Sequence, residues 1–139
     1  MTDSVFDASA LIKLVIGEDG SPAALNAYRA ATRVIVPDWS LLEVASAVRK
    51  RIARTEVTAD EGRGAVAAVR RLDLHDVPGS DFADAAFEMA LTTGAAVYDC
   101  LYIAVAEDAA AQLVTADRRQ AVAARNRGVD VLTIEAGNP

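Results

Sequence analysis

The amino-acid sequence predicts one α/β domain in which helices cover a parallel sheet. Short apolar runs alternate with longer segments whose apolar residues recur at helical spacing, which is typical of this class. The chain has 139 residues, enough to bury a substantial core, and no internal repeat or linker divides it. Aromatic residues are only 5% of the chain, so Val, Leu, Ile and Ala must build that core. We expect a single domain over residues 1–139, with its core at about 4–134.

The first half of the chain contains two predicted strands and four predicted helices. They are a strand at 4–6, helices at 9–16 and 21–32, a strand at 34–36, and helices at 38–54 and 58–72. Ser9 and Asp38 are placed to cap their helices, and Ser21-Pro22 starts a helix because proline suits a first helical position. Pro37 ends the second strand, and residues 58–61 resemble a capping box.

The second half contains three predicted strands and three predicted helices. They are a strand at 74–77, a helix from 80 or 81 to 93, a helix from 99, a strand at 113–115, a helix from 117 or 118 to 128, and a strand at 131–134. Pro78-Gly79 closes the first of these strands, and Gly94 fits the left-handed residue that follows a helix. We expect the tail at 135–139 to be loose.

Composition and charge exclude several classes of protein. The net charge of −6 and a sequence pI near 4.7 argue against a protein that coats nucleic acid with a broad basic surface, although local basic runs can still hold phosphates. One cysteine excludes an internal disulfide framework. No apolar run reaches the ~20 residues of a membrane span, and residues 1–4 lack the features of a signal peptide. We therefore expect a soluble cytoplasmic protein that does not enter a membrane.

Four acidic residues lie at junctions between predicted elements or early in a helix. Asp7 follows the first strand, Asp117 follows the fourth, Asp99 begins a helix, and Glu43 lies in the long helix at 38–54. Functional clefts of parallel sheets lie outside the carboxyl ends of the strands, so Asp7 and Asp117 share a cleft if strands one and four are neighbours. Taken alone, however, an acid at a helix start is usually a cap, and Glu43 is usually solvated. Spacing by itself leaves both interpretations open.

Convergence of these acids would restrict the chemistry to metal-assisted reactions. Three or four carboxylates within a few ångströms cannot all ionise without a cation, because like charges raise one another's pKa. Oxygen ligands select Mg²⁺ or Mn²⁺ over zinc, and a carboxylate-held divalent pair is a known solution for phosphodiester hydrolysis. The single His75 supplies neither a zinc set nor a convincing Ser-His-Asp triad, and no glycine-rich phosphate loop is present. Cys100 beside Asp99 is better explained by packing than as a nucleophile.

Four segments carry a family resemblance. They are VFDASALIK at 5–13, LEV at 42–44, YDCLYIAVAE at 98–107 and LVTADRR at 113–119. In this order and spacing the chain resembles a PIN domain, and specifically a VapC-type toxin ribonuclease of a type II toxin–antitoxin system. Each segment alone is weakly specific, whereas the four together, spanning about residues 4–134, are quite specific.

The resemblance implies an acidic quartet of Asp7, Glu43, Asp99 and Asp117 that is both catalytic and metal-binding. Asp7 and Asp99 would be the firmest ligands, Asp117 would complete the site, and Glu43 would bind the metal directly or through water. Cys100 stands where a small residue such as Ala is common, a departure that leaves the neighbouring acid intact. The quartet has no missing member.

Other residues match supporting positions. Ser9 and Thr115 match hydroxyl positions that hold the carboxylates by hydrogen bonding, although capping and strand-end packing explain them as well. Basic residues could hold the RNA backbone, and the weaker candidates for this role are Lys13, Arg49, Lys50, Arg54, Arg118 and Arg119. A basic run at a helix end also complements the helix dipole without any ligand. Trp39 is better explained by packing or a dimer contact than by stacking on bases. Tyr98 and Tyr102 are at best residues of the site's rim, and core packing explains them better.

The family fold is a three-layer sandwich in which a parallel sheet of strand order 3-2-1-4-5 is flanked by helices. The implied activity is Mg²⁺- or Mn²⁺-dependent endonucleolytic hydrolysis of RNA, in which a metal-activated water attacks the phosphate in line and leaves a 5′-phosphate and a 3′-hydroxyl. The implied partners are a cognate VapB-type antitoxin whose tail enters the cleft, an RNA substrate (tRNA, rRNA or mRNA) and a second copy in a homodimer.

Three alternatives share parts of the pattern. A receiver-like phosphoacceptor module would need adjacent acids after strand one and a Lys after the last strand, but Asp7 stands alone and Glu135 follows that strand. A haloacid-dehalogenase-like phosphatase would need a second Asp two residues after the first, where this chain has Ser9. A catalytically inactive PIN domain that only binds a partner is disfavoured by the intact quartet.

Overall fold

The computed structural model describes residues 2–134 and has a five-stranded parallel sheet at its centre. The strands are β1 (Ser4–Phe6), β2 (Val34–Pro37), β3 (His75–Val77), β4 (Gln112–Thr115) and β5 (Val131–Thr133). Their order is β3-β2-β1-β4-β5, so the order 3-2-1-4-5 is confirmed. It differs from the order 2-1-3-4-5 of receiver-type folds, which makes the receiver interpretation wrong. The tail expected to be loose lies outside the described residues.

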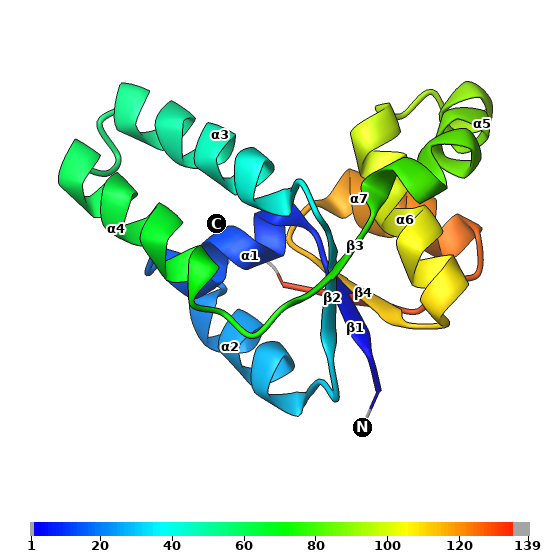
Figure 1. Ribbon diagram of the computed structural model, residues 1–139, viewed down its shortest axis with the longest axis horizontal. Coiled ribbons are helices and arrows are strands. Elements are labelled where there is room, and N and C mark those ends of the chain that lie inside the picture. Colours follow the sequence, from blue (N-terminus) through cyan, green and yellow to red (C-terminus); the bar gives the residue numbers. More distant parts are fainter. Residues whose placement is uncertain (1, 135–139) are drawn as a thin grey trace.

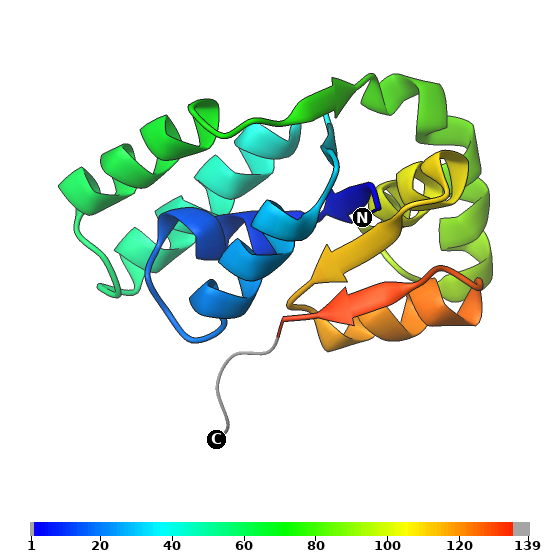
Figure 2. The same cartoon turned by 90° about the horizontal axis from the view of Figure 1, so that it is seen from below.

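Helices cover both faces of the sheet, as Figures 1 and 2 show. On one face lie α1 (Ala8–Val15), α2 (Ser21–Ala30), α3 (Ser40–Ala53) and α4 (Ala59–Arg70). On the other lie α5 (Ala83–Thr93), α6 (Val97–Ala109) and α7 (Arg118–Asn126), with a short 3₁₀ helix, η1 (Gly79–Phe82), leading into α5. The predicted three-layer sandwich is therefore confirmed, and α3 and α4 extend from it as an antiparallel pair (Figure 1).

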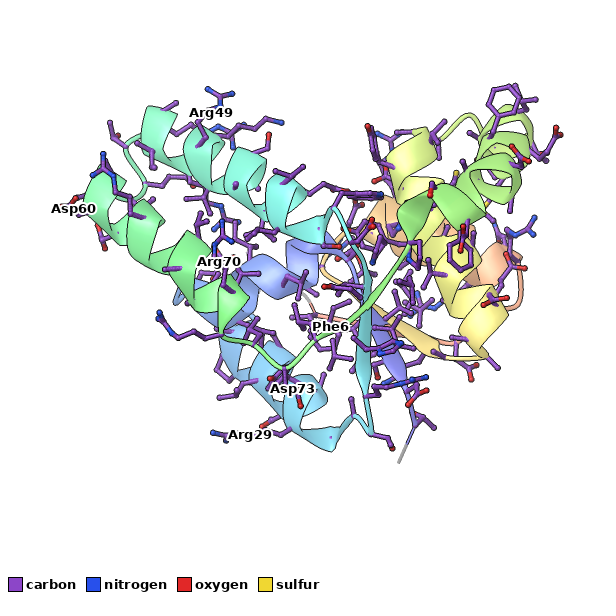
Figure 3. The ribbon with its side chains drawn as sticks, in the orientation of Figure 1. Phe6, Arg29, Arg49, Asp60, Arg70 and Asp73 are labelled. Carbon is purple, nitrogen blue, oxygen red and sulfur yellow. The ribbon has the colours of Figure 1, made fainter. Side chains whose placement is uncertain are left out.

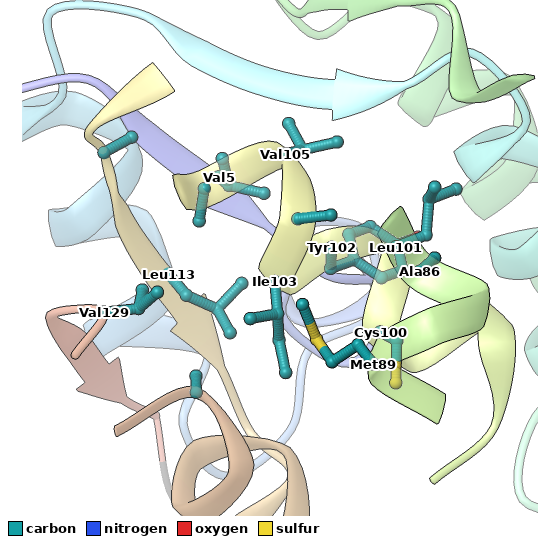
Figure 4. Close-up of a cluster of buried hydrophobic side chains, with 14 of the residues drawn as sticks. Val5, Ala86, Met89, Cys100, Leu101, Tyr102, Ile103, Val105, Leu113 and Val129 are labelled. Carbon is teal, nitrogen blue, oxygen red and sulfur yellow. The ribbon is translucent and has the colours of Figure 1, made fainter. Parts of the chain in front are cut away.

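The central strand β1 holds the two halves of the core together. Val5 pairs with Ile35 of β2 and with Leu113 of β4, and all three side chains belong to the core beneath α5, α6 and α7 (Figure 4). Phe6, the next residue, points to the opposite face and packs among the residues of α1 and α3. Both faces of β1 are thus fully buried, which explains the apolar Val5 and Phe6, while the buried Ser4 hydroxyl accepts a hydrogen bond from the Gln112 side chain.

The structure corrects two of the predicted helix caps. Asp7, not Ser9, is the N-cap of α1, because its Oδ1 accepts the Ala10 N–H at 3.0 Å. The helix α3 begins at Ser40, and the Asp38 carboxylate accepts the Gly79 N–H at 3.2 Å instead of capping. In both places the helix that follows the strand begins at a different residue from the one that local propensity predicts. The capping box that opens α4 is confirmed.

No single helix within residues 2–134 is long and apolar enough to cross a membrane. One bent pair, Gly79–Thr93 with Val97–Ala109, passes by length and composition, but its two parts are bent by 117°. Most residues of α6 are buried in the core of the domain (Figure 4).

Leu113→Ala is expected to lower the free energy of unfolding by about 2–5 kcal/mol, because this fully buried side chain on β4 would leave a cavity. Leu132→Ala on the neighbouring β5 is the matched control, because Leu132 is 39% exposed. It should cost less than about 1 kcal/mol. Urea denaturation of the three proteins measures the difference, and equal losses for the two variants would contradict the assignment of β4 to the core.

Candidate active site

Asp7 lies at the point where β1 ends and α1 begins, with only 5% of its surface exposed. The Ser9 hydroxyl donates to Oδ1 at 2.6 Å, and the Thr115 hydroxyl from the end of β4 donates to Oδ2. Burial raises the pKa of Asp7 to about 6, although these hydrogen bonds and that of Ala10 act to lower it. The carboxylate is therefore held in one orientation in a place where its charge is poorly solvated.

Ser9 and Thr115 also join the turn after β4 to the start of α1. The Ala116 N–H donates to the Ser9 Oγ at 2.9 Å, and the Asp117 N–H donates to the Thr115 Oγ1 at 3.0 Å. Each hydroxyl thus donates to the Asp7 carboxylate and accepts from the chain that leads into α7. The two residues lie where a supporting role for the carboxylate requires, and Ser9 does this instead of capping the helix.

Asp117 and Asp99 approach the same cleft from α7 and α6. Asp117 is exposed and is the N-cap of α7, where its Oδ1 accepts the N–H groups of Arg119 at 2.9 Å and Gln120 at 3.3 Å. Asp99 lies in the first turn of α6 and is half-buried. Burial and then the charge of Asp117 raise the pKa of Asp99, while Arg119 lowers it. The charge of Asp117 also raises the pKa of Asp7, so Asp117 lies near both of the other aspartates.

Glu43 approaches from the first turn of α3. Its Oε1 is buried and has no hydrogen-bond partner within residues 2–134. Burial raises the pKa of Glu43 to about 7, the Tyr102 side chain lowers it, and the charges of Asp99 and Asp7 raise it further. An unpaired buried carboxylate oxygen is costly, which makes this atom the clearest sign of a missing partner in the cleft.

The structure therefore brings the four predicted acids close enough for their charges to act on one another, near the carboxyl ends of β1 and β4. The charges of Asp117 and Asp7 raise the pKa of Asp7 and Glu43, respectively. Asp99 likewise interacts with Asp117 and with Glu43. As the side chains stand, no three His, Cys, Asp or Glu residues of the described chain form a closed metal-binding group. The charges of the acids act on one another, but a bound cation would have to draw their oxygens closer together.

A groove of about 830 Å³ leads away from two of these acids. Its floor and walls come from the turn between α5 and α6 and from one side of α7, and it contains Asp99 and Asp117. Arg118 and Arg119, two of the predicted RNA contacts, line the same groove. The structure thus places these two basic residues beside the acids, where they can meet an anionic ligand.

The other predicted RNA contacts lie elsewhere. Lys13 is buried, and its ammonium donates to Glu18 Oε1 at 3.2 Å and to the Asp19 carbonyl at 2.7 Å, with Arg51 on the other oxygen of Glu18. Lys13 joins α1 to the following turn, so its prediction as an RNA contact is wrong. Arg49 is exposed at the far part of α3 from Glu43 (Figure 3). Lys50 and Arg54 are exposed near the same end of the helix.

One residue expected to pack in the core also lies beside the acids. Tyr102 is buried in α6, three residues after Asp99, with its hydroxyl 3.2 Å from the Ser40 hydroxyl. Burial and the charge of Glu43 raise the pKa of Tyr102, so the hydroxyl keeps its proton beside Glu43. The i, i+3 spacing from Asp99 was the available signal, since it places both side chains on one helix face.

The sequence of the chain is similar to a known family of proteins. The sequence model of the PIN domain matches residues 4–126, most of the chain. The chain belongs to the PIN-domain family. Ribonuclease VapC3 of Pyrobaculum aerophilum is 31% identical over 121 residues, which cover 84% of this chain and 91% of that protein. Ribonuclease VapC9 of Mycobacterium tuberculosis is 35% identical over 115 residues, covering 83% and 86%. These identities place the chain among the VapC ribonucleases of the PIN-domain family.

Solved PIN-domain structures share the fold. VapC20 of Mycobacterium tuberculosis, described as a toxin that cleaves the sarcin-ricin loop, superposes with a TM-score of 0.69 at 16% identity, covering 86% of this chain and 94% of that one. A toxin–antitoxin complex from Klebsiella pneumoniae contains a chain with a TM-score of 0.65 at 17% identity, covering 96% and 99%. At such identities the likeness establishes the fold alone.

Glu43→Gln is expected to stabilise the metal-free protein at high pH. The pKa of Glu43 is raised from 4.5 to about 7 in the folded protein. The protonated side chain therefore contributes fully to stability below pH 4.5, and this contribution is lost as the pH rises through about 7. Glutamine does not titrate, so the variant should exceed the wild type by about 1 kcal/mol at pH 8, after allowance for solvent screening. At pH 5 the gain should largely disappear.

Thermal melts in EDTA at pH 5 and pH 8 measure this difference. Glu88→Gln on the exposed side of α5 is the control and should change stability equally at both values. A gain for Glu43→Gln that is the same at pH 5 and pH 8 would contradict the burial of an unpaired carboxylate.

Proposed function

We propose that the protein is the toxin of a toxin–antitoxin pair and an Mg²⁺- or Mn²⁺-dependent endoribonuclease. The observation that carries this proposal is the Glu43 Oε1, which is buried without a partner in the described part of the chain, among acids that raise one another's pKa. Such an arrangement is unfavourable for the protein alone and favourable with a cation. The names of the similar VapC ribonucleases support RNA as the substrate class.

The donor set fits a divalent cation of the magnesium class. All four candidates are carboxylates, and Mg²⁺ and Mn²⁺ favour oxygen ligands. Asp7, Asp99 and Asp117 would hold the cation, and Glu43 would bind it directly or through water. A bound cation would polarise the phosphate and lower the pKa of the attacking water.

The chain's own residues hold these acids in place. Donation from Ser9 and Thr115 favours the ionised form of Asp7 and fixes its orientation. The N–H groups of Arg119 and Gln120 at the start of α7 donate to the Asp117 Oδ1 and fix the orientation of that carboxylate. The intact set of acids with these supports argues against a catalytically inactive domain.

The proposed substrate is an RNA of the tRNA, rRNA or mRNA class. Arg118 and Arg119 line the groove that contains Asp99 and Asp117, so they can contact phosphates on either side of the one that is cleaved. The net charge of −6 confines this attraction to the groove, because the protein as a whole repels RNA. We place this activity in the cytoplasm, where such substrates are available.

RNA cleavage is expected to disappear in EDTA and to return when Mg²⁺ or Mn²⁺ is added in excess. Asp99→Asn should reduce cleavage to background, because it removes a charged ligand. Asp108→Asn, exposed at the far end of the same helix α6, is the matched control and should cleave like the wild type. Cleavage that persists in EDTA, or in Asp99→Asn, would contradict the proposed site.

Thr115→Val keeps the shape of the buried side chain but removes the hydroxyl that donates to Asp7. It is expected to weaken Mn²⁺ binding roughly 10- to 100-fold, the usual effect of losing a partner of a metal ligand. Titration of Mn²⁺ followed by calorimetry measures this affinity independently of cleavage.

We also propose a VapB-type antitoxin as partner and a homodimer as the form of the toxin. A chain of the solved toxin–antitoxin complex from Klebsiella pneumoniae shares the fold, which supports such a partner. An antitoxin tail with a basic residue would suit the acidic cleft. The family resemblance supports the homodimer, and sedimentation of the purified protein tests it.

A second groove, of about 420 Å³, lies between α3 and α4 and suits an antitoxin helix. Apolar side chains, among them Val48, Ile52 and Val66, line it, and Arg49 and Arg70 lie along it (Figure 3). An amphipathic helix with acidic residues at its edges would match both features. This surface is separate from the acids, so an antitoxin could bind it while its tail enters the cleft.

Expression of the toxin alone is expected to arrest growth, and co-expression of a small protein encoded directly upstream should relieve the arrest. The double variant Arg49→Glu/Arg70→Glu should weaken the complex at least about tenfold, because each reversal opposes an acidic helix. Arg29→Glu, at an exposed position of α2, is the control and should leave the affinity unchanged. Affinity is measured by calorimetry. RNA cleavage by the free double variant should match the wild type, and a loss there would assign Arg49 to RNA instead.

A further inference from the structure

We propose that Tyr98 is a stacking platform for a base of the RNA, placed next to the phosphate that is cleaved. This inference rests on the proposed ribonuclease function and adds a positioning residue to it. Tyr98 is 63% exposed and immediately precedes Asp99 in the first turn of α6. An exposed aromatic ring beside a candidate metal ligand is where an unpaired base could lie.

Tyr98 is the outer end of a ladder of three aromatic rings. Its ring meets Trp39 edge-to-face, with centroids 5.0 Å apart and planes at 80°. Trp39 in turn meets the buried Tyr102 at 5.4 Å and 75°. The ladder runs from the core to the surface, and an edge-to-face contact uses the edge of one ring. With 63% of its surface exposed, Tyr98 contacts this ladder without being covered by it.

The middle of the ladder is held tightly. A Cβ added to Gly79 would lie 2.4 Å from the Trp39 Nε1, so only glycine allows η1 to approach the indole this closely. The Gly79 N–H also donates to the Asp38 carboxylate, which ties η1 to the residue before Trp39. At the inner end, the Tyr102 hydroxyl is hydrogen-bonded to Ser40. A platform fixed in this way loses little conformational entropy when a base stacks on it.

The position of the ladder indicates which ligand it serves. Trp39 directly precedes α3, which carries Glu43, and Tyr98 directly precedes Asp99. The ladder therefore joins the starts of the two helices that supply these acids. Asp99 also lines the groove with Arg118 and Arg119. Phosphates in that groove would leave an adjoining base within reach of Tyr98, and aromatic rings bind bases of any sequence.

The first experiment measures RNA affinity without cleavage. A fluorescein-labelled, mixed-sequence single-stranded oligoribonucleotide is titrated with protein in EDTA and followed by anisotropy. Tyr98→Ala is expected to bind about tenfold more weakly than wild type, and Tyr98→Phe to bind like wild type. Tyr98→Leu separates stacking from apolar contact and should lose affinity as Ala does. Wild-type affinity in Tyr98→Ala or Tyr98→Leu would overturn the proposal.

The second experiment measures cleavage of the same RNA with Mg²⁺ or Mn²⁺. Tyr98→Ala should raise KM about tenfold with kcat largely kept, because the ring positions substrate and holds no metal. A loss of kcat at unchanged KM would overturn the proposal. Phe87→Ala is the control, since Phe87 on α5 is 51% exposed and is not part of the ladder. It should leave both constants unchanged.

Two further measurements separate base stacking by Tyr98 from a role in folding and from a contact with a second copy. Thermal melts show whether Tyr98→Ala remains folded, as the exposure of Tyr98 predicts. If Tyr98→Ala unfolds, the RNA affinities of Tyr98→Phe and Tyr98→Leu decide whether the ring stacks on a base. In sedimentation, a changed oligomeric state with unchanged RNA affinity would overturn the proposal. If the wild type cleaves RNA and Tyr98→Ala cleaves it equally, this inference alone fails. If the wild type neither binds nor cleaves RNA, the proposed function fails.

Discussion

The Asp7 carboxylate lies almost out of solvent between the end of β1 and the start of α1, and three other parts of the chain are arranged around it. Hydroxyls from α1 and from the end of β4 donate to its two oxygens. The same hydroxyls accept N–H groups of the turn that leads to Asp117. The position of α7 is therefore coupled to the orientation of Asp7, so the two acids are placed by one hydrogen-bonded network.

The same burial makes the cleft unfavourable for the protein in the absence of a ligand. Burial raises the pKa of Asp7, Glu43 and Asp99, and their like charges oppose joint ionisation. A protein commonly accepts such a local cost where it binds a ligand that removes it. The unpaired Oε1 of Glu43 and the open arrangement of the acids fit this description, because a ligand would add the interactions that the described part of the chain lacks.

Much of the fold and part of the site could be predicted from the sequence. Each of the five strands lies within a residue of its predicted place, because strand periodicity and the Pro and Gly residues that end strands are local signals. The candidate acids could be named because they follow strands or open helices. Residues whose role depends on distant neighbours were judged less well: Lys13 is basic in sequence but buried against Glu18, and Ser9 serves the carboxylate instead of capping.

The sequence by itself determined the alternation of strands and helices, the family resemblance and the identity of the four acids, since all of these are written in local order and spacing. Only the tertiary structure decided which carboxylate is buried and which is exposed, because that depends on β4 lying beside β1. It also decided that Trp39 links Tyr98 to Tyr102, a contact between residues some sixty positions apart in the chain. Burial and ring contacts arise from long-range packing, and no local pattern records them.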